Sequence, residues 1–190
     1  MERYAAGDDG AFEEVYDHLA DRLACYVGRR VRDRAVAEDI VQETFLHMHR
    51  ARGNFIRGAE VLPWAFAIAR RLMIDNDRVA RRHKMTVLDG DDDRQVPAAM
   101  TTAASAEELV QAKETAARLH AELAQLSHPQ RDAFELLKNE GLSLAQTAAV
   151  LSTSVTAVKL RAHRAYLALR RALGDSALPP GAAPSMEEES

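Results

Sequence analysis

The sequence predicts an all-α protein made of two small helical domains joined by a flexible linker. Apolar residues recur three or four positions apart on both sides of a central stretch that has no such period. Only 5% of the 190 residues are aromatic, which disfavours a β-sandwich, and 6 Pro and 9 Gly leave room for long helices. The expected boundaries are 8–84 for the first domain, 85–104 for the linker, 105–174 for the second domain and 175–190 for a disordered tail.

Three helices are expected in the first domain. Asp8 or Asp9 can cap the first, the second runs from about Val36 to His49, and the third has Pro63 in its first turn, where the missing N–H does no harm. The expected buried stripes are Phe12, Val15, Tyr16, Leu19, Leu23 and Val27, then Ala37, Ile40, Val41, Thr44, Phe45 and Met48, then Trp64, Ala65, Ile68, Leu72 and Val79.

The linker is acidic, with four aspartates between Asp89 and Asp93, and is interpreted as a mobile tether. Helical periodicity resumes at Ser105, which forms a capping box with Glu108. Ser127 and Pro129 end this helix and begin another.

Two helices separated by a tight turn are predicted between Gly141 and Leu173. Ser143 and Gln146 form a capping box for the first helix, residues 152–154 break the period and offer a second cap, and Gly174 suits the helix end. The apolar stripe of the second helix is Val155, Val158, Ala162, Ala165, Leu169 and Leu173.

The other face of that second helix is basic, and no acidic residue occurs from Val155 to Leu173. An apolar helix, a turn and a one-sidedly basic helix are typical of a helix-turn-helix, whose second helix enters the DNA major groove. The alternative is a solvated basic helix of an ordinary helical bundle. The basic face consists of Lys159, Arg161, His163, Arg164, Arg170 and Arg171.

Charge is segregated along the chain. The formal net charge is −4, yet the segment Arg70–Lys84 holds six Lys or Arg against two Asp. Local basic surfaces in an acidic whole suit a protein that touches DNA at chosen places and binds a protein elsewhere. The single cysteine, Cys25, excludes an internal disulfide and a cysteine-rich zinc site, and is expected to be a small core residue. With no apolar run of membrane-spanning length and no signal peptide, a cytoplasmic protein is expected.

Four motifs follow one another along the chain, and their order and spacing indicate a protein family. The segment Ala37–Leu46 reads AEDIVQETFL, and Pro63–Arg71 reads PWAFAIARR, followed by Ile74-Asp75 and Arg78. Leu126 and Arg131 then precede the Gly141–Arg170 segment. Over about residues 8–84 and 106–173, the chain resembles bacterial RNA polymerase sigma factors of the extracytoplasmic-function (ECF) class. The resemblance implies that the two domains are sigma region 2, a helical bundle, and sigma region 4, a helix-turn-helix.

The resemblance implies that the AEDIVQETFL helix docks on core RNA polymerase through Glu38, Asp39, Gln42 and Glu43, an acidic and amide row suited to arginines. The alternative is a solvated helix face. The loop 52–62 would capture a flipped base of the minus-ten element: Asn54 can hydrogen-bond a base edge, whereas Phe55 either stacks on it or anchors the loop.

The same resemblance assigns two basic DNA-binding surfaces. In the third helix, Trp64 is mainly a core residue and the cations neutralise promoter phosphates. In the helix-turn-helix, the first residues of the second helix lie in the major groove of the minus-thirty-five element. The DNA-binding residues expected in this way are Arg70, Arg71, Arg78, Arg81, Arg82 and Lys84, then Thr153, Ser154, Thr156, Ala157, Lys159, Arg161, His163 and Arg164.

Several differences from the family pattern limit which family properties can be expected of this chain. The turn has Ser152 where the family commonly has Gly, and Thr156–Arg161 reads TAVKLR where GTVKSR is common. The base-reading residues therefore differ, so promoter preference does not transfer. Arg71 replaces a usual Asn, and the expected proline before Arg131 is displaced to Pro129.

The sequence thus predicts a transcription initiation factor whose partners are core RNA polymerase, promoter DNA and an anti-sigma factor, soluble or membrane-bound. The alternatives are a sigma mimic that binds an anti-sigma factor without DNA, and a conventional helix-turn-helix regulator. No enzyme, metal site, cofactor or small-molecule substrate is expected, because the histidines are scattered and no catalytic motif occurs.

Overall fold

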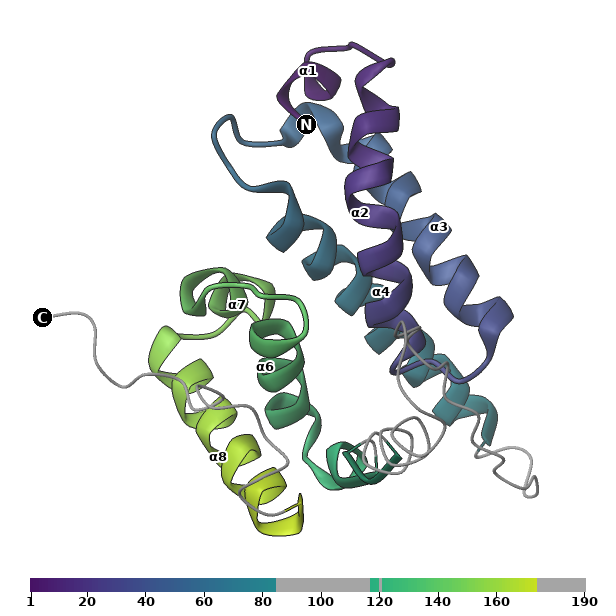
Figure 1. Cartoon of the computed structure of the whole chain (residues 1–190). Helices are drawn as coiled ribbons and strands as arrows, with labels where there is room; N and C mark the ends of the chain where they lie inside the picture. Colours follow the sequence, from purple (N-terminus) through teal and green to yellow (C-terminus); the bar gives the residue numbers. More distant parts are fainter. Residues whose placement is uncertain (85–116, 120, 174–190) are drawn as a thin grey trace, which may run out of the picture. The chain divides into compact units, whose positions relative to one another are not determined.

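The computed structural model describes residues 1–84 and 117–173 except residue 120, and every regular element in these ranges is a helix. The chain divides into two compact units, Met1–Pro97 and Ala98–Ser190 (Figure 1). None of the described helices is long and apolar enough to cross a membrane. The predicted linker, the capping box of Ser105 and Glu108, Gly174 and the predicted tail lie outside the described residues.

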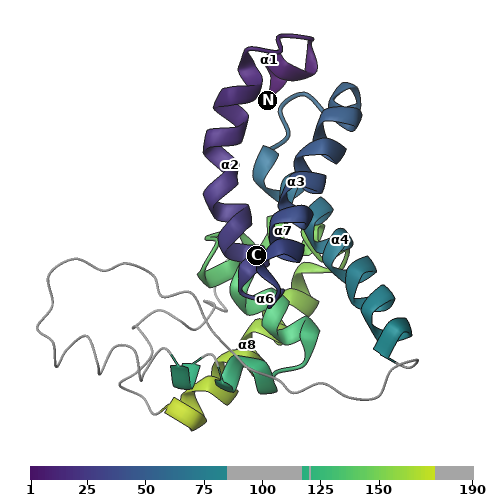
Figure 2. The same ribbon diagram turned by 90° about the vertical axis from the view of Figure 1, so that its right-hand side faces the viewer.

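The first unit is a bundle of three helices: α2 (Ala11–Gly28), α3 (Arg34–Ala51) and α4 (Val61–Lys84), each packed against the other two. A short helix, α1 (Glu2–Ala5), contacts the 3-10 turn η1 (Arg52–Asn54) at one end of the bundle (Figure 1, Figure 2). The sequence patterns predicted the three long helices but not α1 or η1.

The cores of α2 and α3 largely follow the predicted stripes, with Ala11 and Tyr26 added. In α4, by contrast, Ala65 is the one member of the predicted stripe that is buried, and Phe66, Ala69 and Met73, which were not predicted, are buried with it. Tyr26 is fully buried, and its ring meets that of Phe66 edge-on at 4.9 Å between centroids. Trp64, expected in the core, is half-buried. The buried apolar residues of the bundle are Ala11, Val15, Leu19, Leu23, Tyr26, Val27, Ile40, Phe45, Met48, Ala65, Phe66, Ala69 and Met73.

Three expected core residues of the first unit are exposed. Tyr16 packs one face of its ring on Phe45 but remains 46% exposed. Val79 is exposed because it lies near the end of α4, which extends past the ends of α2 and α3 (Figure 2). Cys25 is also exposed, because it lies two positions from both Leu23 and Val27 and therefore projects from the opposite side of α2.

Two helix starts differ from the prediction. Helix α3 begins at Arg34, because the Asp33 carboxylate accepts hydrogen bonds from the N–H groups of Ala35 and Val36 at 2.9 and 3.3 Å. Helix α2 begins after Gly10, so neither Asp8 nor Asp9 occupies its N-cap.

The second unit contains helical residues 117–119 and 121–125, then α6 (His128–Lys138), α7 (Leu144–Val150) and α8 (Val155–Leu173). Helices α6, α7 and α8 pack against one another. One cluster of this unit's core consists of Leu123, Phe134, Ala165 and Leu169, with Leu119 and Leu126 packed against it.

The capping box predicted for Ser143 and Gln146 is confirmed, and the structure adds a second one, between Ser127 and Gln130, that was not predicted. The Gln130 side chain accepts from the Ser127 N–H at 3.2 Å. The Ser143 hydroxyl accepts from the Gln146 N–H at 3.1 Å, and the Gln146 side chain accepts from the Ser143 N–H at 2.6 Å. These bonds fix the starts of α6 and α7.

The turn between α7 and α8 is a Schellman motif. The N–H of Thr153 donates to the carbonyl of Ala148 at 3.0 Å, and that of Ser152 donates to the carbonyl of Ala149 at 3.2 Å. Ser152 has a φ of 49°, in the left-handed region that favours glycine. The prediction that Val155 is buried is wrong: it is 37% exposed, at the first position of α8.

Candidate polymerase and nucleic-acid interfaces

The outer face of α3 carries the four residues predicted to bind the polymerase. Glu38, Asp39 and Gln42 are exposed and Glu43 is half-buried. They project opposite Ile40, Thr44, Phe45 and Met48, which fix the rotation of the helix by facing the core.

Two of these four side chains already have neighbours on α3. Arg34 Nε lies 2.7 Å from Glu38 Oε1, and the carboxylate raises the pKa of that guanidinium. His47 lies 3.3 Å from Glu43. Asp39 and Gln42 have no ion pair or side-chain hydrogen bond within the described part of the chain. Because exposed ion pairs contribute little, this face can exchange them for a partner's cations at low cost.

The loop after η1 holds Asn54 and Phe55. Asn54 is exposed, whereas Phe55 is half-buried and lies against Trp64 with 5.2 Å between ring centroids. The structure therefore favours the anchoring role for Phe55. The next residue, Ile56, is 75% exposed, and the sequence pattern did not single it out.

The basic run of α4 contains two acids, Asp75 and Asp77, and the first of them lies between two arginines. Asp75 lies 4.0 Å from Arg71 and 3.4 Å from Arg78, both of which are exposed, and Arg70 is half-buried. Arg81, Arg82 and Lys84 belong to α4, but their side chains lie outside the described atoms. The two exposed arginines are thus held along one face, three or four residues from the shared carboxylate.

The predicted DNA-binding residues around the start of α8 form two groups, one exposed and one half-buried. Thr156, Leu160 and Arg164 are exposed and recur every four residues, so they form one outward stripe. Half-buried residues flank this stripe; they are Thr153, Ala157, Lys159, Arg161 and His163.

Ser154 has a structural task. Its hydroxyl accepts a hydrogen bond from the N–H of Ala157 at 3.2 Å and so caps α8.

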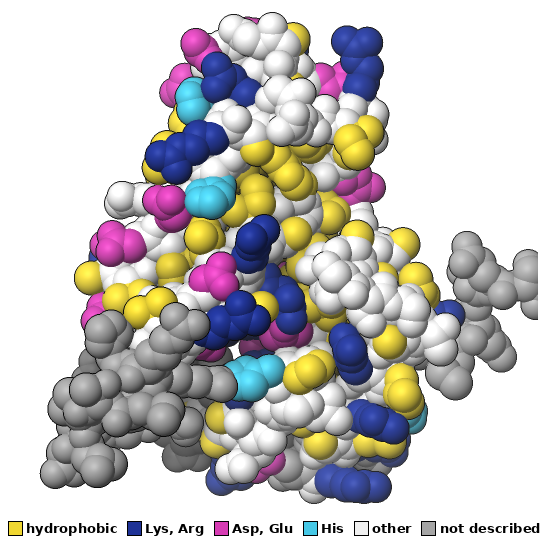
Figure 3. All heavy atoms as spheres, turned by 180° about the vertical axis from the view of Figure 1, so that it is seen from behind, with side chains coloured by type: hydrophobic (Ala, Val, Ile, Leu, Met, Phe, Trp, Pro, Cys, Tyr) yellow, Lys and Arg dark blue, Asp and Glu magenta, His cyan; other side chains and the backbone are white. Residues whose placement is uncertain are grey.

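Figure 3 shows Lys and Arg side chains along the lower right part of the view, formed by the second unit, with few acidic ones among them. The arrangement fits a helix that offers its N-terminal turns to a groove and its cations to phosphates.

Two family models match the chain: Sigma-70 region 2 over residues 15–83, and Sigma-70, region 4 over residues 116–169. The chain is 36% identical over 177 residues to the RNA polymerase sigma factor CarQ of Myxococcus xanthus, covering 92% of this chain and 96% of that protein. It is 31% identical over 174 residues to the ECF RNA polymerase sigma factor SigM of Mycobacterium tuberculosis, covering 90% and 81%.

The fold also matches a solved structure, the sigma factor RpoE of Bartonella quintana in complex with the anti-sigma factor NepR. The TM-score is 0.70 at 22% sequence identity, and the match covers 86% of this chain and 97% of that chain. This likeness supports the two-unit helical architecture.

Proposed function

The chain belongs to the ECF class of sigma-70 factors, the initiation factors that direct RNA polymerase to promoters, and we propose that each of its exposed faces has one part in that task. The outer face of α3 docks on core polymerase, the loop after η1 and the basic side of α4 engage the opening minus-ten element, and α8 reads the minus-thirty-five element. The observation that carries the proposal is that each of these faces presents exposed side chains on the side of its helix or loop away from the core: Asp39, Asn54, Arg71, Arg78, Thr156 and Arg164.

Docking through α3 is supported by its charge and its free groups. Asp39 and Gln42 offer acceptors to an arginine-bearing partner helix, and bidentate arginine–carboxylate pairs are strong and directional. Within the described part of the chain, the ion-pair partners of Glu38 and Glu43 all belong to α3, so both glutamates can exchange those pairs for the same partner.

Promoter opening requires no chemistry by this chain. Asn54 is exposed at the end of η1, where its amide can meet the edge of an extruded base. The arginines of α4 neutralise phosphates of the separating strands. Binding of the extruded base then offsets part of the few kcal/mol that unstacking costs.

Recognition of the minus-thirty-five element uses the exposed stripe of α8. Thr156 and Leu160 are placed for base edges and apolar groove contacts, while Arg164 lies one turn further along, nearer the phosphates. We further propose that an anti-sigma factor covers these faces; the similar sigma factor RpoE is in complex with the anti-sigma factor NepR. The chain would act in the cytoplasm, on the chromosome, without an enzymatic activity of its own.

The test is run-off transcription with purified core polymerase on promoters that the holoenzyme selects from a random DNA pool. Specific transcripts are expected with the wild-type chain. Asp39→Lys should abolish both transcripts and polymerase binding, because it places a like charge against the partner's arginines. Asp17→Lys makes the same charge change on an exposed residue of α2 and serves as the matched control.

Each outcome separates the rival functions. Polymerase binding without transcripts would favour a sigma mimic that titrates a regulator. Binding to duplex DNA without any polymerase association would favour a conventional helix-turn-helix regulator. Equal loss with Asp39→Lys and Asp17→Lys would place the docking surface elsewhere than on α3.

A further inference from the structure

The short helix α1 touches three other parts of the first unit with three consecutive residues. Successive side chains of a helix are about 100° apart, so a single turn can face several neighbours. Glu2 reaches the loop after η1, Arg3 reaches α2, and Tyr4 reaches the end of α3. Helix α1 precedes the residues that match the family model.

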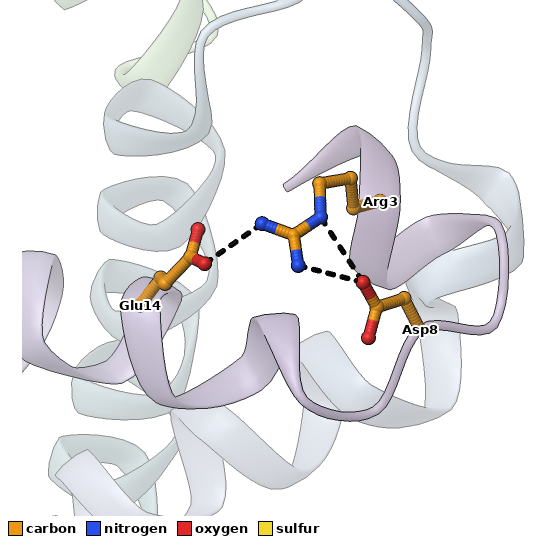
Figure 4. Close-up of polar contacts among 3 residues, drawn as sticks. All are labelled: Arg3, Asp8 and Glu14. Carbon is orange, nitrogen blue, oxygen red and sulfur yellow. Dashed lines mark hydrogen bonds and ion pairs between the residues drawn. The ribbon is translucent and has the colours of Figure 1, made fainter.

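Arg3 fixes α1 to the bundle. Its guanidinium donates from Nε and Nη2 to Asp8 Oδ2 at 3.0 and 2.8 Å, and from Nη1 to Glu14 Oε1 at 2.7 Å (Figure 4). Arg3 thus bridges two acids, one just after α1 and one in the first turn of α2. This arrangement holds α1 in a defined orientation.

Tyr4 connects α1 to the end of α3 and to η1. It is 1% exposed; its hydroxyl is hydrogen-bonded to His49 Nδ1, and the Arg52 guanidinium lies over its ring at 5.6 Å. Arg52 also donates to His49 Nε2 at 3.0 Å. Since arginine can only donate, Nε2 accepts; the neutral imidazole then carries its proton on Nδ1 and donates it to the Tyr4 hydroxyl.

Glu2 holds the loop itself. Its carboxylate accepts a hydrogen bond from the backbone N–H of Gly58 at 2.7 Å, across 56 residues of sequence. Gly58 has a φ of 81°. Three residues earlier in the loop, Phe55 is held by its contact with Trp64. The exposed residue Ile56 therefore lies between two fixed points, and the exposed Asn54 directly precedes the first of them.

We propose that α1 is a positioning element for promoter opening: Glu2 and Tyr4 hold the loop of residues 52–60 in the shape that receives an extruded base. This inference rests on the proposed function of that loop. A loop ordered before binding does not lose that conformational freedom when the base arrives, so the contact of Glu2 improves affinity without touching DNA. Glu2 and Tyr4 are positioning residues.

The first test measures exchange of the Gly58 amide proton by NMR in the full chain. Glu2→Ala should accelerate exchange, whereas Glu2→Gln, whose side-chain oxygen can still accept, should restore much of the protection. Glu13→Ala, an exposed acid of α2 with the same change in charge, is the control. Equal exchange in Glu2→Ala and Glu13→Ala would overturn the proposed contact.

The second test measures binding of the holoenzyme to labelled single-stranded DNA that carries the non-template minus-ten sequence of a selected promoter. Glu2→Ala should weaken binding about three- to ten-fold, the usual effect of one intramolecular hydrogen bond. On the same DNA with the captured base replaced by an abasic site, the penalty should vanish, because the positioned loop then has nothing to receive. Tyr4→Phe, which removes only the hydroxyl, should follow the same pattern.

The outcomes are distinguishable. A penalty that persists on abasic DNA, or that equals the effect of Glu13→Ala, would overturn the positioning role while leaving the sigma function intact. A wild-type holoenzyme that yields no specific transcripts would overturn the proposed function, and this inference with it.

Discussion

Phe55 lies against Trp64, with ring centroids 5.2 Å apart and ring planes inclined by 56°. This contact connects the loop after η1 to the first turn of α4, so the loop is held from within the protein before any DNA is present. The neighbouring Ile56, at 75% exposure, is the apolar side chain of this loop that remains available to a ligand.

Phe55→Ala should therefore destabilise the free protein. Loss of a half-buried aromatic side chain is expected to lower the free energy of unfolding of the first unit by about 1–2 kcal/mol, below the range for fully buried phenylalanines. Urea unfolding monitored by the fluorescence of Trp64, the single tryptophan, measures this directly. Ile56→Ala is the control, with a change within about 0.5 kcal/mol. Unchanged stability of Phe55→Ala with weaker DNA binding would instead identify Phe55 as a base-stacking residue.

Two substitutions of Ser154 should separate its role in folding from its proposed role in DNA binding. Ser154→Ala removes the cap of α8 and should lower the stability of the second unit by about 1 kcal/mol. Ser154→Asp keeps a capping oxygen, so stability should be retained, but its charge should repel phosphates and weaken promoter binding. Calorimetry of the full chain and duplex binding by the holoenzyme provide the two measurements. Equal DNA affinity in Ser154→Asp and wild type would remove Ser154 from the DNA interface.

The features that sequence predicted best are those decided by neighbouring residues. Ser143 with Gln146 and the cap at Ser154 both involve partners three positions apart, so the pattern of residue types is enough to find them. The rotation of α3, and with it the outward position of the row proposed to bind the polymerase, followed from the apolar period alone.

The features that sequence missed depend on tertiary packing. Whether Tyr16, Tyr26 or Cys25 faces the core depends on where α3 and α4 cross α2, which a single helical period does not fix. The contact between Glu2 and Gly58 joins residues 56 positions apart and has no local signal. The same is true of Tyr4 with His49. Helix α1 itself has only four residues, too few to display a period.

Ser152→Gly should stabilise the second unit. A serine at a φ of 49° has a Cβ in a strained conformation that glycine avoids, and this gain exceeds the extra freedom glycine has in the unfolded chain. The expected gain is about 0.5–1 kcal/mol, or a rise of a few degrees in the melting temperature of that unit. Ser152→Val should lower the melting temperature of the second unit. The unfolding transition of the first unit, followed by Trp64 fluorescence, should stay unchanged. A lower melting temperature for Ser152→Gly would contradict the strain argument.

Arg164→Gln should weaken DNA binding by the same factor for all sequences. If Arg164 contacts a phosphate, the slope of log affinity against log salt should fall by about 1 when its charge is removed. Binding of the holoenzyme to minus-thirty-five duplexes at several salt concentrations measures the slope. Thr156→Val, a nearly isosteric and uncharged change on the same stripe, should leave the slope unaltered. An unchanged slope with relaxed preference at one base pair would show that Arg164 reads a base instead.

The attachment of α1 should depend on pH only under acidic conditions. Hydrogen bonds from Arg3 hold the pKa of Asp8 below its usual value of 3.8 (Figure 4). Because the folded-state pKa is depressed, the stabilising contribution of Asp8 is fully present above pH 3.8 and is lost as the pH falls through the lower, folded-state value. Carbon-13 NMR titration of the Asp8 carboxyl should give an apparent pKa below 3.8, and Arg3→Gln should return it toward that value. An Asp8 pKa that does not respond to Arg3→Gln would show that Arg3 does not hold this carboxylate in solution.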